Sequence, residues 1–334
     1  ALELVNARGQ ILQCDSDINS ELFNAARAGL GQFGIITRVR MRIEPAPTTV
    51  TLEHRVFDSF DAFADAVGLL RDVPGIHGLL AHAVPNNPAA IARSMGLEEQ
   101  ALARPEHHDC SATWLYDLEV MRYHSEGEPG DVPATGHLDW CFSSRQWAFD
   151  QFVRRIPPII ERDQRAGSAP HPELAMFIPQ SSAREFIGGT MAALSVEEMG
   201  GGPILLIPLT RSQVSTPLFR IPEEAHCWLF GLLRAATPDA VERLQRANLS
   251  LYHQGLQAGG LRYPCDSMQL PASDEEWAAH YGDHWEPAEA ARQLADPEAL
   301  LETNRFKRSH SEQRADPSAG ARGAGSNPLT ELVP

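Results

Sequence analysis

A glycine-rich segment lies between a predicted helix and a predicted strand, and this order limits the folds open to the chain. The segment reads Gly29-Leu30-Gly31-Gln32-Phe33-Gly34, which has the spacing of the dinucleotide-binding fingerprint. That fingerprint requires a strand before the glycines and a helix after them, so that the helix N-terminus meets the pyrophosphate. Here a helix over 20–28 comes first and a strand over 35–43 follows, which argues against a Rossmann fold. We interpret the glycines as a turn that lets the backbone approach another strand or a flat ligand.

The first residues predict a β-hairpin that needs a neighbouring strand. Residues 2–5 and 11–13 read as two short strands around Gly9. A strand that begins at residue 2 must pair, so we expect its partners to lie upstream of Ala1; the alternative is a natural start on an edge strand. The sequence has no basic and apolar leader of a signal peptide, and a cytoplasmic location is favoured.

The strand over 35–43 alternates and then meets two prolines. Ile35, Val39 and Met41 share one face, and arginines occupy the other, which predicts a half-buried strand. The segment Glu44-Pro45-Ala46-Pro47 ends it, because proline cannot donate to a ladder. We place a domain boundary there.

Beyond Thr48 the pattern predicts an α+β fold, with an antiparallel sheet covered by helices. The predicted strands are 114–123, 173–179, 203–209 and 226–234. The predicted helices are 57–70, 146–156, 182–194 and a long one that begins near Thr237-Pro238, with the apolar stripe Val241, Leu244, Ala247 and Leu251. Residues 302–334 have few large apolar side chains and are predicted to be disordered.

Charge and cysteine content exclude several classes of protein. The 334 residues carry 28 basic and 44 acidic side chains, a net charge of −16. Such a chain repels phosphate backbones and anionic lipid, which argues against nucleic acid or a membrane as partner. No apolar run approaches the roughly 18 residues that a membrane span needs. The 5 cysteines form no CxxC pair, so neither a disulfide framework nor a zinc ribbon is indicated.

Other ligand-rich motifs have an ordinary structural interpretation. His280 and His284 could share one helix face as metal ligands, but Gly282 weakens a helix between them, and we expect no metal. Residues 106–110 read as a solvated loop. Tyr263, Trp277, Tyr281 and Trp285 could stack on a ligand, although such aromatic residues more often belong to a core.

Several short segments occur in an order that is typical of one enzyme family. They are Glu21-Leu22-Phe23, residues 29–38, Glu44-Pro45-Ala46-Pro47, residues 115–120, Pro170-His171-Pro172, Phe177-Ile178-Pro179, residues 202–205, residues 228–234, Glu276-Trp277, residues 280–285 and Asp296-Pro297. Together they resemble the cytokinin dehydrogenases, flavoproteins of the vanillyl-alcohol-oxidase or PCMH type. The resemblance covers about residues 2 to 301. Residues 29–38 occur across the wider flavin superfamily, whereas the order of the others points to the cytokinin branch.

The resemblance implies a PCMH-type FAD-binding domain that is split in sequence around a substrate domain. Residues 1–46 would be the last part of the first FAD-binding segment, 47–260 the substrate (cytokinin-binding) domain, 261–306 the return to the FAD-binding domain and 307–334 a disordered tail. The phosphate-cradling loop, the histidine that carries covalent flavin and the family's Asp base would precede this chain. We therefore expect the chain alone to be inactive and marginally soluble, since unpaired strand edges would be exposed.

The resemblance also implies a chemistry and a few site residues. FAD would oxidise the N6 side chain of an adenine-type cytokinin to an imine, which then hydrolyses. Ile36 and Tyr263 match cofactor-binding positions, and His77 and Pro264 match substrate-binding positions; no catalytic residue can be named. His77 stands where the family usually has a substrate-facing Glu, and Glu173 where it prefers Trp. Residues 302–305 replace an expected Ser/Thr-Pro-Gly-Gln turn.

Two other functions remain open. The departures at His77 and Glu173 are compatible with an FAD-linked oxidase of alcohols or sugars. A non-catalytic remnant that binds a purine, or nothing, would explain the lack of the base and of the flavin-linking histidine. In each active form the partner is a small-molecule substrate, and the oligomeric state is left open.

Overall fold

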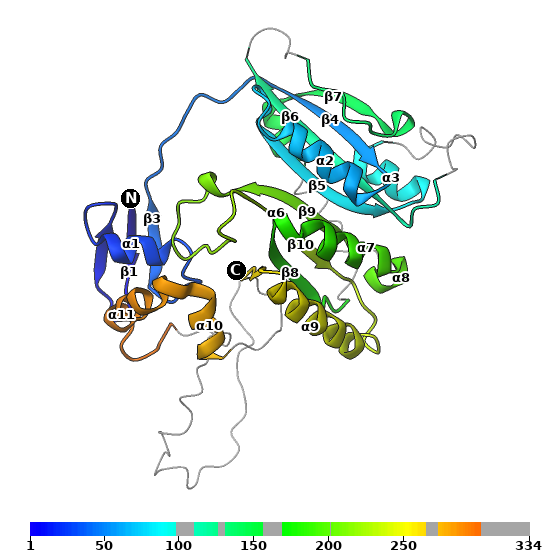
Figure 1. The fold of residues 1–334 in the computed structure, drawn as a ribbon. Helices are drawn as coiled ribbons and strands as arrows, with labels where there is room; N and C mark the ends of the chain where they lie inside the picture. The colour runs from blue at the N-terminus through cyan, green and yellow to red at the C-terminus, as the bar shows by residue number, and fades with distance from the viewer. Residues whose placement is uncertain (98–109, 126–130, 156–168, 201, 265–272, 302–334) are drawn as a thin grey trace, which may run out of the picture.

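The chain forms two antiparallel sheets joined by an extended linker (Figure 1). The computed structural model describes residues 1–97, 110–125, 131–155, 169–200, 202–264 and 273–301. The smaller sheet has the order β2-β1-β3, and the larger has the order β11-β8-β10-β9-β5-β6-β4-β7. Every pairing is antiparallel, and helices cover the larger sheet, which confirms the predicted α+β class.

The smaller sheet brings together the two ends of the described chain. Its elements are β1 (Leu2–Val5), β2 (Ile11–Cys14), α1 (Ser20–Ala26) and β3 (Ile35–Val39). After the larger sheet, α10 (Asp274–Tyr281) and α11 (Trp285–Ala295) return and pack against α1 (Figure 1). Trp277 and Tyr281 share a buried cluster with Ala25 and Phe33, so residues far apart in sequence form one apolar core.

The larger sheet holds most of the chain. Its strands are β4 (Thr49–Phe57), β5 (Gly78–Pro85), β6 (Trp114–His124), β7 (Ser143–Ala148), β8 (Glu173–Pro179), β9 (Ile204–Thr210), β10 (His226–Leu233) and β11 (Leu261–Arg262). Its helices are α2 (Phe60–Leu70), α3 (Pro88–Met95), α4 (Phe149–Val153), α6 (Gln180–Ala183), α7 (Gly189–Ala193), α8 (Val196–Met199) and α9 (Val241–Gln257). A π-helical turn, Arg184–Gly188, joins α6 to α7.

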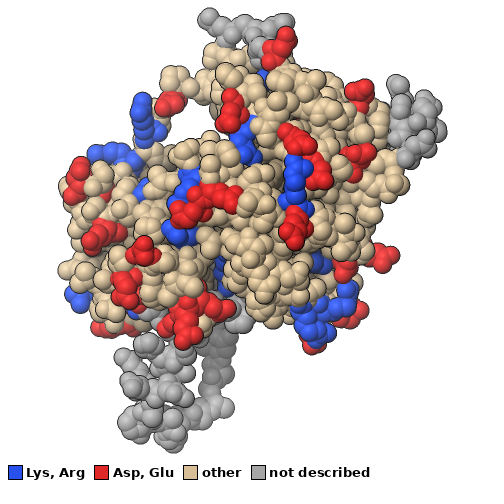
Figure 2. Space-filling model, in the orientation of Figure 1, with Lys and Arg blue, Asp and Glu red and all other residues tan. Residues whose placement is uncertain are grey.

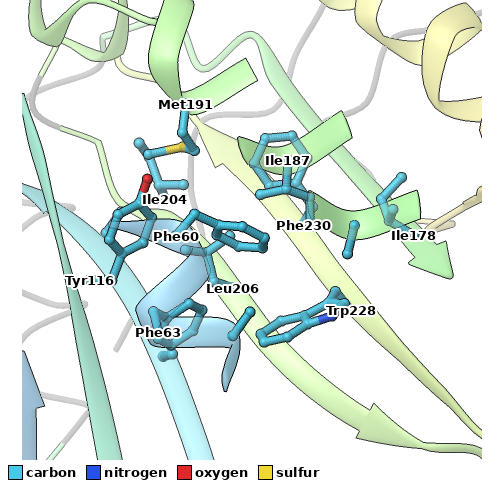
Figure 3. Close-up of a cluster of buried hydrophobic side chains, with 14 of the residues drawn as sticks. Phe60, Phe63, Tyr116, Ile178, Ile187, Met191, Ile204, Leu206, Trp228 and Phe230 are labelled. Atoms are coloured by element: carbon cyan, nitrogen blue, oxygen red, sulfur yellow. The ribbon is translucent and has the colours of Figure 1, made fainter. Parts of the chain in front are cut away.

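One face of the larger sheet, which we call the first face, carries the main core. Alternate strand residues point to it, and α2, α7 and α9 cover it (Figure 1). At its centre Phe63 of α2 stacks on Tyr116 at a ring-centroid distance of 5.6 Å, and its ring lies 5.4 Å from that of Trp228 (Figure 3). Burial of each such ring stabilises the fold by about 1.5–3 kcal/mol.

The opposite face, which we call the second face, is covered only in parts. Residues of α3 pack on it beside Val56 and Leu115, and Phe152 of α4 packs beside Leu52. At the other end Phe219 and Ile221, from the segment between β9 and β10, cover Phe177. Between these covers lies a half-buried strip, formed by Leu80, His82, Leu205, Ile207 and Leu229.

The expectation of a half-buried strand over 35–43 is wrong. The strand ends at Val39 and all five residues of β3 are exposed, with Ile35 at 62% and Val39 at 53%. Met41 and Ile43 are also exposed. The reason is that β3 is an edge strand of the smaller sheet, and no other described element packs on its apolar side chains.

Other sequence predictions need smaller corrections. The first three residues of the helix predicted over 146–156 belong instead to strand β7, because they pair with β4, and helix α4 follows for only five residues. The predicted helix over 57–70 begins at Phe60, where the Ser59 side chain caps it, and the predicted helix at Thr237 begins at Val241. The residues of the proposed tail, 302–334, and most of the 106–110 loop lie outside the described residues.

Candidate functional site

The glycine-rich turn serves the smaller sheet. Gly31 and Gly34 have backbone φ angles of +85° and +136°, which residues with a side chain rarely adopt. A Cβ atom on Gly34 would lie 2.9 Å from the carbonyl oxygen of Val5, so glycine lets β3 start beside β1. Of the two interpretations drawn from the sequence, the close approach to another strand is the one realised between described residues.

The two residues expected to bind cofactor lie on different sheets. Ile36 projects from exposed β3 and is itself 42% exposed. Tyr263 follows β11, where its N–H donates to the carbonyl of Ala175 and its ring packs edge-on against Phe177 and Phe219. The segment that carries Phe219 also places Leu218 in the core of the smaller sheet, so it connects the two regions.

His77 lies on the surface beside a small pocket. The Tyr123 backbone N–H donates to Nδ1 of His77 at 3.0 Å, and the two rings stack 5.1 Å apart. The adjacent pocket, about 100 Å³, is also lined by Ile76, Arg122 and Asp131. Pro264 is half-buried and ends the described segment after β11. The structure gives no contact between Pro264 and His77 among its described residues.

A cluster of polar side chains that the sequence did not single out lies on the second face. Asp117 of β6 is only 1% exposed, and His54 Nδ1 of β4 lies 3.1 Å from both of its carboxylate oxygens. The Ser94 hydroxyl of α3 donates to Asp117 Oδ2. His82 Nε2 of β5 lies 2.6 Å from Ser94 Oγ and 3.6 Å from Asp117 Oδ2. The register of three strands puts Asp117 on one face with His54 and His82, and the sequence alone does not supply that register; Ser94 joins them from α3.

The charges of this cluster stabilise one another. Burial alone would lower the pKa of His54, but Asp117 and Glu119 offset burial, so the pKa of His54 is raised. Burial would likewise raise the pKa of Asp117, and His54, His82 and the Ser94 hydrogen bond lower it overall. The cluster therefore favours an imidazolium at His54 beside an ionised Asp117. Next to it, Arg155 donates to Glu119 at 2.7 Å, which completes a balanced set of charges.

The aromatic residues after residue 260 are mainly structural. Trp277 and Tyr281 are buried, and Trp285 packs against their cluster, as expected for a core. His280 is buried beside them, and burial together with Arg262 and Arg220 lowers the pKa of His280 to about 4. Within the described ranges, no group of three or more His, Cys, Asp or Glu side chains is arranged to hold a metal ion.

The charged side chains of one face can be followed in the space-filling view. Figure 2 shows carboxylates spread over the face in view, with arginines among them. None of the helices in the described part of the chain has the length and apolar character to cross a membrane.

Comparisons with known proteins identify the family. The family model described as "Cytokinin dehydrogenase 1, FAD and cytokinin binding" matches residues 84–305. Cytokinin dehydrogenase 3 of Arabidopsis thaliana is 24% identical over 320 residues, covering 90% of this chain and 60% of that protein. Cytokinin dehydrogenase 1 of Oryza sativa subsp. japonica is 27% identical over 331 residues, covering 90% and 61%.

The fold itself also has solved counterparts. Carbohydrate oxidase from Microdochium nivale superposes with a TM-score of 0.59 at 11% identity, over 91% of this chain and 64% of that one. At this identity the likeness shows the fold alone. The chain spans about 60% of the length of the curated relatives it matches. On the strength of the family match, the chain belongs to the cytokinin dehydrogenase family of FAD-linked oxidoreductases.

Proposed function

We propose that this chain supplies the substrate domain and part of the FAD-binding domain of an oxidoreductase that acts on the CH–NH group of an adenine-type cytokinin. The observation that carries the proposal is the family match over residues 84–305, which spans most of the larger sheet and returns to the smaller one. Residues 1–46 and 261–306 would belong to the FAD-binding domain and residues 47–260 to the substrate domain. The return of α10 and α11 to α1 supports this division.

The smaller sheet has a surface that suits a missing half. Ile35, Ile36 and Val39 of edge strand β3 are exposed, and soluble proteins seldom leave such a strand uncovered. We infer that an upstream FAD-binding segment pairs with or covers β3. Without it, the 334-residue chain would be marginally soluble and inactive.

We infer that Ile36 and Tyr263 contribute to one part of an FAD site. Ile36 and Tyr263 offer apolar and aromatic surface of the kind that a flat ring system requires. FAD, when bound, supplies the acceptor for the hydride that leaves the substrate carbon. The chain's own contribution would be to orient the substrate and to hold hydrogen bonds to it, with His77 and Pro264 as the expected substrate contacts.

The substrate side departs from the family pattern at His77. Because the Tyr123 N–H occupies Nδ1, the neutral imidazole carries its proton on Nε2 and presents a donor, whereas a Glu would present an acceptor. This departure is compatible with a second candidate, an oxidase of alcohols or sugars, whose oxygens could accept this hydrogen bond as the ring nitrogens of a purine could. The pocket of about 100 Å³ is smaller than usual ligand sites of roughly 300–1,000 Å³ and would take a side chain only.

A substrate panel separates these candidates. The longer protein that this proposal requires, with an FAD-binding segment before Ala1, is purified with FAD and mixed anaerobically with isopentenyladenine, benzyl alcohol or xylobiose. Bleaching of the flavin by isopentenyladenine supports the proposal. Bleaching by the alcohol or the sugar alone selects the second candidate, and a flavin that stays oxidised with all three removes both in favour of a non-catalytic purine-binding remnant.

A further inference from the structure

We propose that His82 is a hydrogen-bond acceptor for the ligand in this half of the protein, and that Ser94, Asp117 and His54 position it. The inference rests on the proposed function, because it concerns the ligand that would occupy the second face. It adds a binding residue within this chain to the base that the family carries elsewhere.

His82 lies on the strip of the second face that the helices leave half-buried. Strand register places Ala175, Gly231, Leu205, His82 and Asp117 opposite one another in a continuous row across five strands. At strand spacings of about 4.8 Å, Ala175 and His82 are about 14 Å apart. The backbone N–H of Tyr263 donates to the carbonyl of Ala175, so the expected cofactor contact lies at one end of the row, and His82 followed by Asp117 lies at the other.

The hydrogen-bond directions determine which nitrogen of His82 carries the proton. The lowered pKa of Asp117 keeps its carboxylate ionised, so it can only accept, and Ser94 donates its one hydroxyl proton to it. Ser94 Oγ must then accept from its second neighbour, His82 Nε2, at 2.6 Å. The neutral imidazole therefore has its proton on Nε2 and a lone pair on Nδ1.

The lone pair on Nδ1 gives His82 its proposed role. A ligand N–H or O–H can donate a hydrogen bond to Nδ1, while Nε2–H donates to Ser94 Oγ at 2.6 Å and so fixes the orientation of the ring. Asp117 is held in place by Ser94 and by His54, which bonds to both of its oxygens. His77 presents the opposite polarity, because its Nδ1 already accepts from the backbone. The two histidines would thus offer one donor and one acceptor.

The hydrogen-bond network of Asp117, His54, Ser94 and His82 ends at a side chain that solvent can reach, which a purely structural network does not require. Asp117 and His54 are buried, but the His82 side chain keeps 20% of its surface exposed. A network that served only to tie α3 to the sheet could end at Ser94. Its extension to a partly exposed imidazole beside Leu205 points to a ligand on this strip.

The test uses the 334-residue chain with ¹⁵N-labelled histidine, together with the longer FAD-loaded protein. Two probes of the same shape are compared: isopentenyladenine, and the purine in which oxygen replaces the N6 N–H. We expect His82 to be the Nε2–H tautomer. On adding isopentenyladenine the ¹⁵N resonance of Nδ1 should move, and binding should be about tenfold tighter than for the oxygen analogue, as one hydrogen bond allows.

Two variants make the test decisive. His82→Leu should remove the preference for the N–H probe, whereas His253→Leu, at an exposed position on α9, should keep it. An Nδ1–H tautomer at His82 in the wild-type chain, or an unchanged preference in His82→Leu, would overturn the inference. The tautomer of His82 is measured without ligand or FAD, so it tests the inference even if neither purine binds. Failure of both purines to bind would count against the proposed function instead.

Discussion

Replacing Asp117 with Asn should destabilise the fold by about 3 kcal/mol. Asp117 is 1% exposed and bonds to His54 and Ser94, so the substitution leaves a buried imidazole without its counter-ion. Loss of one partner of a buried ion pair costs about 3–5 kcal/mol, and the retained amide oxygen places this case at the lower end. The assay is urea unfolding followed by far-UV circular dichroism at pH 7, with the free energy of unfolding extrapolated to water.

The same pair predicts how stability depends on pH. The pKa of His54 is raised in the folded state, so its contribution is complete below the unfolded pKa of about 6.5 and is lost as pH rises through the folded pKa. The pKa of Asp117 is lowered, so its contribution is present above about 3.9 and is lost as pH falls through the folded pKa. The pair therefore stabilises most between these limits.

A surface pair gives the matched control. Asp65 bonds to Arg184 but is 75% exposed, so Asp65→Asn should change the free energy of unfolding by less than about 1 kcal/mol. The description of a buried imidazolium–carboxylate pair would be refuted if Asp117→Asn changed the free energy of unfolding as little as Asp65→Asn does. It would also be refuted if the free energy of unfolding of Asp117→Asn still decreased above pH 6.5 as that of the wild type does.

Three further predictions concern the glycine turn, the core and His280. Gly34→Ala should destabilise the fold by more than about 1 kcal/mol, because φ is +136° and the added Cβ would meet the carbonyl of Val5. Gly68→Ala is the control: it lies in an open position on α2 and should stabilise the fold by about 0.5–1 kcal/mol in the same unfolding assay. Phe63→Ala should cost about 3–5 kcal/mol by calorimetry or denaturant, because its ring is fully buried among aromatic neighbours. The lowered pKa of His280, about 4, means that the unfolded chain takes up this proton first as pH falls below 6.5, so His280→Phe should reduce the loss of stability between pH 6.5 and 4.

The sequence predicted half of the larger sheet, namely the four strands β6, β8, β9 and β10, because these are apolar runs that lie between clear breaks. It did not predict β4, β5, β7 and β11 as strands. Residues 173–179 were assigned as a strand with the bounds that the structure has, and 114–123 and 226–234 differ by one residue. Residues 143–148 were missed because Trp147, Phe149, Phe152 and Val153 have helical spacing, yet pairing with β4 outweighs that local pattern.

The site was harder to predict because its residues come from separate elements. His54, His82 and Asp117 meet only through strand register, and Ser94 joins them from a helix that covers the second face. No short motif encodes such an arrangement. The expected burial of Ile35 and Val39 failed for another reason: alternation predicts which side chains share a face, but it does not supply the element that covers them.

The central claim is that this chain is one part of a flavin-binding unit whose other part covers β3. The most direct test measures equilibrium binding of FAD by the quenching of flavin fluorescence. The proteins compared are the 334-residue chain and the proposed longer product, each with and without Ile36→Lys. We predict that the longer product binds FAD, that Ile36→Lys weakens this binding at least tenfold, and that the 334-residue chain alone does not bind. Equal binding of FAD by the chain alone, or a longer product that binds none, would contradict the account.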